Sequence, residues 1–184
     1  MLAKTPTPDR APNVLWADML LIAFLIGFDV VARLLPHAPG FMPVAASALF
    51  AGRMLRIPLL SPIVPIAAMA LSGTFMGADD WRVALIVYAA ITLPAFAGMA
   101  SQRWRGLAVP FAVMLPCSLI FFAASNFVVW AFSGMYSLTW QGLTQCYIAA
   151  LPFLQTSVAG DMSWTAVLFG GAWAVQSLPA LARR

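Results

Sequence analysis

Long apolar runs, separated by short polar or proline-containing breaks, make up most of the chain. The runs cover residues 14–35, 43–54, 59–77, 83–99, 107–132 and 162–178. A helix rises about 1.5 Å per residue and needs about 20 apolar residues to cross a bilayer. The pattern therefore predicts about six transmembrane helices. The run 43–54 is short for a crossing, so we expect that helix to be tilted, sunk against its neighbours, or extended by residues 56–60.

Two segments lack this pattern. The proline-containing residues 1–12 are predicted to be a flexible tail. Residues 133–160 mix polar aromatic and amide side chains with short apolar runs, which predicts an interfacial helix near 139–151 instead of a crossing. The predicted organisation is a tail over 1–12 and a single transmembrane helical domain over 13–184.

The composition supports an all-α, polytopic integral membrane protein. Hydrophobic side chains make up 62% of the chain, charged ones only 9%, and the mean hydropathy is +0.90. A soluble domain carries about 25% charged residues. Cys117 and Cys146, the two cysteines, are too few for a disulfide scaffold.

The few charges are sorted along the chain. With the N-terminus in the cytoplasm, six crossings put all of the ten Lys and Arg residues except Arg33 and Arg82 on the cytoplasmic side: Lys4, Arg10, Arg53, Arg56, Arg103, Arg105, Arg183 and Arg184. The positive-inside rule therefore favours six crossings of a bacterial inner membrane with both termini cytoplasmic. Because the basic residues are scattered, we expect membrane lipid and not nucleic acid around the chain.

Recognisable catalytic motifs are missing from the sequence. It has one histidine, no glutamate, and no zinc-protease, serine-hydrolase or phosphate-binding loop pattern. We therefore expect no catalytic residues, no metal and no cofactor. An intramembrane enzyme using Asp79, Asp80 or Asp161 remains an alternative.

Candidate binding residues gather on the predicted outer side. Asp29 and Arg33 are one helical turn apart, either as an internal ion pair or with one member turned toward a ligand in an outward cavity. His37 is an exposed loop residue, a hydrogen-bond donor to substrate or a ligand to a metal centre. The aromatic residues are either an interfacial belt or a binding surface for a flat molecule. The candidate substrate-binding residues are Arg33, His37, Asp79, Asp80, Trp81, Asn126, Trp130, Tyr136, Gln141, Gln145 and Asp161.

Small residues recur at four-residue spacing in several predicted helices. Ala23 and Gly27 form such a pair in the first helix, and Ala48 and Gly52 in the second. Rows of this kind let helices approach closely. We expect most of them to pack inside the protein and at least one to be left for a partner subunit.

Three stretches resemble a known family. They are RLLPHAPGFMPV (33–44) leading into ALFAG (48–52), SNF (125–127) with Trp130, and residues 142–161. They are similar to an uncharacterised bacterial family described only as transport proteins. That family in turn resembles the substrate-binding S components of energy-coupling-factor vitamin transporters.

The resemblance implies six helices with both termini inside and an outer ligand pocket closed by the loops after the first and third helices. It also implies that Ala23 and Gly27 dock a transmembrane coupling subunit that works with ATPases. We therefore expect a substrate-binding membrane protein for uptake of a vitamin- or cofactor-like small molecule. A structural or assembly subunit of a larger membrane complex is the alternative.

Overall fold

The computed structural model describes residues 10–76 and 81–181, and its regular elements there are all helical. They are α1 (Arg10–Leu34), α2 (Val44–Met54), the short 3₁₀ helix η1 (Pro58–Leu60), α3 (Ile63–Met76), α4 (Trp81–Ala100), α5 (Val109–Phe132) and α6 (Trp140–Leu181). The first five predicted helices are confirmed to within a few residues. α1 begins at Arg10, inside the predicted tail, and residues 1–9 of that tail lie outside the described residues.

Apolar surface covers the outside of the helices. Four helical stretches are long and apolar enough to cross a membrane: Val14–Leu34, Pro58–Phe75, Trp81–Ala100 and Val109–Phe132. Large apolar side chains such as Leu20, Phe24 and Leu85 are exposed on them. Contact of so much apolar surface with water would be energetically unfavourable. The chain is therefore an all-α membrane protein.

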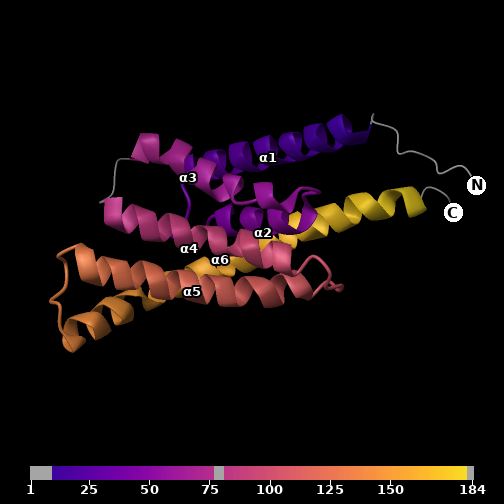
Figure 1. The fold of residues 1–184 in the computed structure, drawn as a ribbon. Helices are drawn as coiled ribbons and strands as arrows, with labels where there is room; N and C mark the ends of the chain where they lie inside the picture. Colours follow the sequence, from indigo (N-terminus) through magenta and orange to yellow (C-terminus); the bar gives the residue numbers. More distant parts are fainter. Residues whose placement is uncertain (1–9, 77–80, 182–184) are drawn as a thin grey trace, which may run out of the picture.

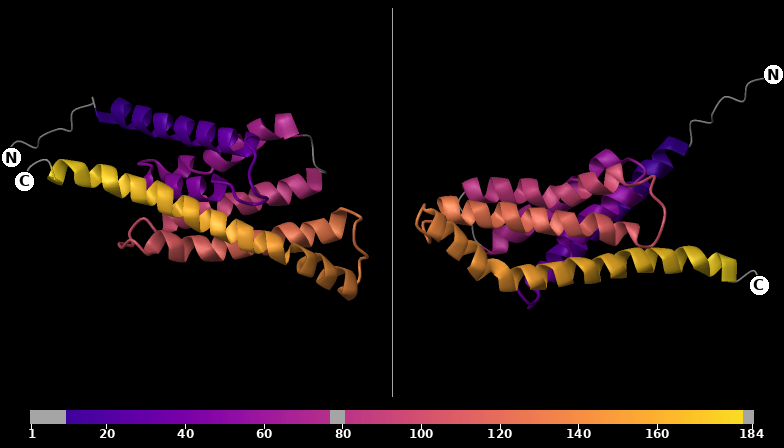
Figure 2. Two further views of the ribbon diagram at one scale, coloured as in Figure 1. Left: turned by 180° about the vertical axis from the view of Figure 1, so that it is seen from behind. Right: turned by 90° about the horizontal axis from the view of Figure 1, so that it is seen from below.

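Successive helices run in alternating directions (Figure 1). The first turn of α1 and the last turn of α6 lie at the same end of the molecule, as both views in Figure 2 also show. We call the loops at 55–62 and 101–108, which lie at that end, the basic end because Arg53, Arg56, Arg103 and Arg105 lie in or next to them. The loop at 35–43 and the turn at 133–139 lie at the opposite end.

Hydrogen bonds hold the basic end together. The Arg53 guanidinium donates to the carbonyl oxygens of Ser101 (2.5 Å) and Trp104 (3.0 Å). The Gln102 amide donates to the carbonyl oxygen of Gly52 at 2.9 Å. The Gln102 bond satisfies a carbonyl that the end of α2 would otherwise leave unpaired, and the Arg53 bonds link the end of α2 to the loop after α4.

α2 is the central helix of the bundle. All residues from Val44 to Gly52 are buried, and the helix packs against α1, α3, α4 and α6. Its 11 residues span about 17 Å, much less than the ~30 Å hydrocarbon layer. Of the three expectations for this short helix, the structure supports a helix sunk against its neighbours.

The backbones of α2 and α4 approach each other closely at Gly52 and Gly98. A Cβ atom on Gly98 would lie 2.6 Å from the carbonyl oxygen of Leu49 and 3.0 Å from the Cα atom of Gly52. A Cβ atom on Gly52 would clash with the carbonyl oxygen of Ala95. The small-residue pair predicted in the second helix therefore packs inside the protein, and its α4 counterpart is Gly98.

α6 differs from the prediction. The sequence predicts an interfacial helix near 139–151 that is separate from the last crossing, but the structure has one continuous helix of 42 residues. Pro152 lies inside it, and Figure 2 shows that the first half of the helix is bent. A proline in a helix interior removes one hydrogen bond and can bend the helix without ending it.

Candidate functional site

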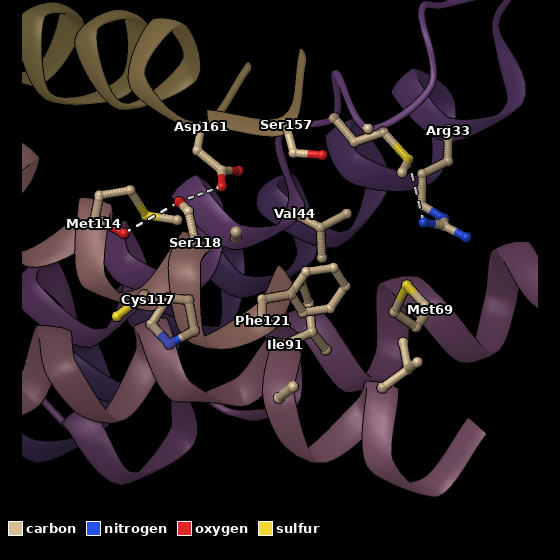
Figure 3. Close-up of a pocket in the computed structure, with 16 residues that line it drawn as sticks. Arg33, Val44, Met69, Ile91, Met114, Cys117, Ser118, Phe121, Ser157 and Asp161 are labelled. Atoms are coloured by element: carbon tan, nitrogen blue, oxygen red, sulfur yellow. Dashed lines mark hydrogen bonds between the residues drawn. The ribbon is translucent and has the colours of Figure 1, made fainter. Parts of the chain in front are cut away.

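A cavity of about 210 Å³ lies among the helices near the 35–43 loop (Figure 3). α2, α4, α5 and α6 each contribute to its wall, together with the end of α1, one residue of α3 and the loop. Most of its lining side chains are apolar, including Val44, Met69, Ile91, Met114 and Phe121. Among the described residues that line it, Arg33 and Asp161 carry the charged groups. An apolar cavity with a few convergent polar groups is the usual form of a small-molecule site.

Arg33 lies at one side of this cavity, held by two neighbouring segments. Its Nε atom donates to the Ser72 hydroxyl of α3 at 2.7 Å, and its Nη1 atom lies 3.3 Å from the Met42 sulfur in the loop. The Ser72 hydroxyl itself donates to the carbonyl oxygen of Ala68 at 2.7 Å. These contacts fix the guanidinium in position, so the cavity has a positive charge at a defined place.

Asp161 lies on the opposite side and is 8% exposed. Its Oδ2 atom accepts a hydrogen bond from the Ser118 hydroxyl of α5 at 2.5 Å. Ser157 precedes Asp161 by four residues on α6, so the two share a helix face, and it also lines the cavity. A carboxyl group inside a membrane bundle is costly and therefore points to a binding or transport role.

A second cavity, of about 200 Å³, adjoins the first. The two share Ser118, Phe121, Ser157 and Asp161, and the second adds Phe122, Ser125, Asn126 and Phe153. The Asn126 amide donates to the carbonyl oxygen of Phe122 at 2.8 Å, within its own helix. Asp161 therefore borders both cavities, and Asn126 lines the second one.

The loop at 35–43 covers part of the first cavity and packs on α6. Gly40 has a φ of +80°, which favours glycine, and a Cβ atom there would clash with the Ser157 hydroxyl. A Cβ atom on Gly160 would lie 2.9 Å from the Cα atom of Phe41. The loop can lie this close to α6 only because both positions are glycine.

The other predicted binding residues lie elsewhere. His37 is exposed and lines a separate surface pocket with Phe28, Phe41 and Trp164. Trp81 is 69% exposed at the start of α4, where the Arg82 guanidinium lies 5.5 Å from its ring centre. Asp79 and Asp80 lie outside the described residues.

The aromatic and amide residues around the α5–α6 turn do not surround Asp161. Gln145 is 16 positions before Asp161 on one helix, or about 24 Å away along its axis. Trp130 donates from its indole to the carbonyl oxygen of Ser137 at 2.9 Å, while Gln141 and Gln145 are exposed and Tyr136 is half-buried. Of the predicted binding residues, the structure therefore brings together Arg33 and Asp161, with Asn126 in the adjoining cavity.

Asp29 interacts electrostatically with Arg33, as one interpretation of the sequence expects, and it also has a hydrogen-bond partner that the sequence does not suggest. It is fully buried, and its Oδ1 atom accepts a hydrogen bond from the Ser47 hydroxyl of α2 at 2.7 Å. This bond links α1 to the central helix. Asp29 is not among the residues that line the Arg33 cavity.

Sequence reasoning missed Ser47, Ser72, Ser118 and Ser157. Serine is common in membrane helices, and only the four-residue spacing of Ser157 and Asp161 gave a usable signal. Ser47, Ser72 and Ser118 each contact a charged residue from a different helix, so finding them requires knowledge of how the helices pack.

Taken together, the fold and the cavity define a helical membrane protein with a partly polar internal cavity. The chain belongs to a family of unknown function, DUF6580, whose model matches residues 14–181. Neither the curated proteins nor the solved structures include a match to it.

Proposed function

We propose that this protein is a substrate-binding integral membrane protein that takes up a vitamin- or cofactor-like small molecule, captured at the outer face. The observation that carries this proposal is the cavity between the helices, with Arg33 at one side and Asp161 at the other. A buried carboxyl group such as that of Asp161 destabilises a membrane bundle unless it is paired or serves a ligand. A packing role alone would not require a cavity beside it.

The proposed topology has six crossings with both termini in the cytoplasm of a bacterial cell. The alternating helix directions support it, as does the position of Arg53, Arg56, Arg103 and Arg105 at the basic end. Basic residues in short loops favour the cytoplasmic side. The loop at 35–43 then faces outward, next to the cavity, where it can admit a ligand from outside.

In the proposed cycle, the ligand enters from outside, the 35–43 loop closes over it, and the whole domain tilts to release it inward. The loop already contacts α6 through Gly40 and Gly160, so its closed position is available to the chain. No covalent bond is made or broken in this cycle, so we do not propose an enzyme.

A transmembrane coupling subunit with ATPases is the proposed energy source. Its docking face would be the exposed side of α1 at Ala23 and Gly27. A Cβ atom on Gly27 would meet no heavy atom of the described chain within 4 Å, so no other described segment covers this position. Small exposed residues let another membrane helix approach closely.

Ligand binding tests the proposal. The protein, purified in detergent, would be titrated with water-soluble vitamins and tetrapyrroles by equilibrium dialysis. We expect at least one to bind with a micromolar or lower Kd, and we expect Asp161→Asn to weaken that binding at least tenfold. Arg103→Gln, an exposed change at the basic end, is the matched control and should leave the Kd unchanged. If no compound binds at micromolar concentration and none co-purifies, the proposal is wrong.

A structural or assembly subunit is the second candidate, favoured by the same exposed face of α1. It predicts a stable stoichiometric partner that is not a coupling ATPase and that is lost in Gly27→Leu. It also predicts that no small molecule depends on Asp161 for binding. Affinity purification of the two forms from membranes, followed by mass spectrometry, separates this candidate from the first.

A further inference from the structure

Two helix faces meet at the second cavity. On α6, Phe153, Ser157 and Asp161 follow one another at four-residue spacing, so they share one face of the helix. On α5, Ser118 and Phe122 have the same spacing. All five residues line the cavity, so two different helices present these faces to it. The fold therefore gathers a carboxyl group, hydroxyl groups and phenyl rings around one space of about 200 Å³.

The charge in this second cavity comes from Asp161. Among the described residues that line the cavity, Asp161 is the one with a charged group, and Arg33 does not line it. Within the described part of the chain, the hydrogen bond to this carboxyl group comes from the neutral Ser118 hydroxyl. A neutral donor stabilises a carboxylate without supplying the opposite charge that a buried ion requires. A cation in the cavity would supply it.

Further oxygen atoms line the same cavity as this carboxyl group. The Ser157 hydroxyl is one, and the Asn126 amide is another. Because the Asn126 nitrogen donates to the carbonyl oxygen of Phe122 at 2.8 Å, its amide oxygen remains as an acceptor for a ligand. Carboxylate, hydroxyl and amide oxygens together favour a group that is positive or donates hydrogen bonds, and they disfavour an anion.

Three phenyl rings complete the wall of the cavity, from Phe121, Phe122 and Phe153. Phe121 borders both cavities (Figure 3). The Phe122 ring is held edge to face against Tyr147, with ring centres 5.7 Å apart. The face of an aromatic ring attracts an organic cation, and the attraction is stronger where water is excluded. Phenyl rings beside a carboxylate are therefore a combination that suits an ammonium group with an apolar body.

The ligand set and the size of the cavity narrow the class of cation. Hard metal ions take oxygen ligands and gain nothing from phenyl rings, and the described residues contain no cluster of three or more His, Cys, Asp or Glu residues. The volume of about 200 Å³ equals that of about seven water molecules at ~30 Å³ each. Drug-sized ligands occupy sites of about 300–1,000 Å³. The space therefore suits a compact organic cation.

We propose that the cavity between α5 and α6 binds a small organic ammonium ion, with its charge held at Asp161 and its apolar body against the rings of Phe121 and Phe122. This inference rests on the proposed function in taking the space around Asp161 as part of a ligand site. It adds the chemical class of the ligand and the residues that select its charge.

Two pairs of probes, each a cation and a neutral molecule of the same shape, test this inference. Choline is paired with 3,3-dimethyl-1-butanol, and benzylamine with benzyl alcohol. Their Kd values would be measured by calorimetry on the purified full chain in a maltoside detergent, which carries no ammonium group. The variants are Asp161→Asn, Phe122→Leu and the control Phe127→Leu. Phe127 is the matched control because it lies on the same helix, contacts the Trp130 ring at 5.5 Å and lines neither cavity.

We expect the wild type to bind at least one cation ten times more tightly than its neutral partner. Asp161→Asn should weaken that cation at least tenfold and leave the neutral molecule unchanged. Phe122→Leu should weaken the cation by about two- to fivefold, as expected for the loss of one cation–ring contact, and Phe127→Leu should not.

Equal binding of cation and neutral partner by the wild type in both pairs overturns the inference, whether or not a variant folds. Failure of both cations to bind at millimolar concentration also overturns it. If Asp161→Asn keeps the preference of the wild type for the cation, or if Phe122→Leu and Phe127→Leu bind it equally, the proposed position of the ligand is wrong.

The two proposals can fail separately. If a vitamin without a positive charge binds and the two cations do not, the proposed ligand class is wrong and the uptake function stands. If the cations bind with the expected dependence on Asp161 but cells that express the protein take up no ligand, the ligand class stands and the uptake function is wrong.

Discussion

The hydrogen bond between Ser118 and Asp161 gives the sharpest test of the cavity. Replacing Ser118 by Ala removes the hydroxyl that donates to Asp161 at 2.5 Å and leaves a buried carboxyl group without this donor. A hydrogen bond to a charged group contributes about 1.5–3 kcal/mol. For a chain of this length, 1 kcal/mol shifts Tm by about 2–4 °C. We therefore expect Ser118→Ala to lower Tm by about 3–12 °C.

The measurement is thermal unfolding in detergent, followed by the fluorescence of the seven tryptophans. Ser125→Ala is the matched control, because Ser125 lies on the same helix and its hydroxyl bonds only to the carbonyl oxygen of Phe122 within that helix, at 3.3 Å. A double-mutant cycle with Asp161→Ala should give a coupling energy above about 1 kcal/mol. If Ser118→Ala and Ser125→Ala have the same Tm, the reasoning about the cavity is refuted.

Three further predictions follow from the packing and the topology. Gly98→Ala should destabilise the protein by about 1–3 kcal/mol, because its Cβ atom would meet backbone atoms of α2, whereas Gly170→Ala faces open space and should not lower Tm. Gly40→Ala should displace the loop between α1 and α2 and speed its hydrogen exchange. Gly134→Ala, which has a similar φ of +70° but no neighbour within 4 Å, should leave that loop unchanged. Alkaline phosphatase fused within residues 101–105 should be inactive, since the enzyme folds only outside the cytoplasm, and an active fusion there would contradict the topology.

Most of the fold follows from the spacing of apolar runs. The helices α1 to α5 begin and end close to the breaks that prolines, glycines and charged residues make in the pattern. The shortness of the 43–54 run predicts an unusual position for α2, and the buried position that the structure shows is one of the three that it allows. These features depend on local sequence, because lipid requires each helix to satisfy its own backbone hydrogen bonds.

α6 could not be predicted in the same way. Its first half is polar enough to look interfacial, and Pro152 suggests a break. Whether a proline bends a helix or ends it depends on the neighbours that stabilise the helix on each side. The contacts of α6 with α5 and α2 supply that support, and they are visible only in the folded chain.

The candidate site was predictable only where a charge lies in an apolar run or directly beside one. Arg33 lies in the run 14–35 and Asp161 directly before the run 162–178, and both line the cavity. The aromatic and amide residues near the α5–α6 turn were grouped with Asp161 because they share a side of the membrane. These residues lie at a different depth from Asp161 because α6 is 42 residues long. That depth can be predicted only when the bounds of the helix are known.

The most direct test of the central claim is the small-molecule content of the protein purified from bacterial membranes. Native mass spectrometry would compare the wild type with the double variant Arg33→Gln/Asp161→Asn and with Arg103→Gln. We predict a bound small molecule on the wild type and on Arg103→Gln that is absent from the double variant. The same bound mass on all three forms, or on none of them, would contradict the claim that this cavity is a ligand site.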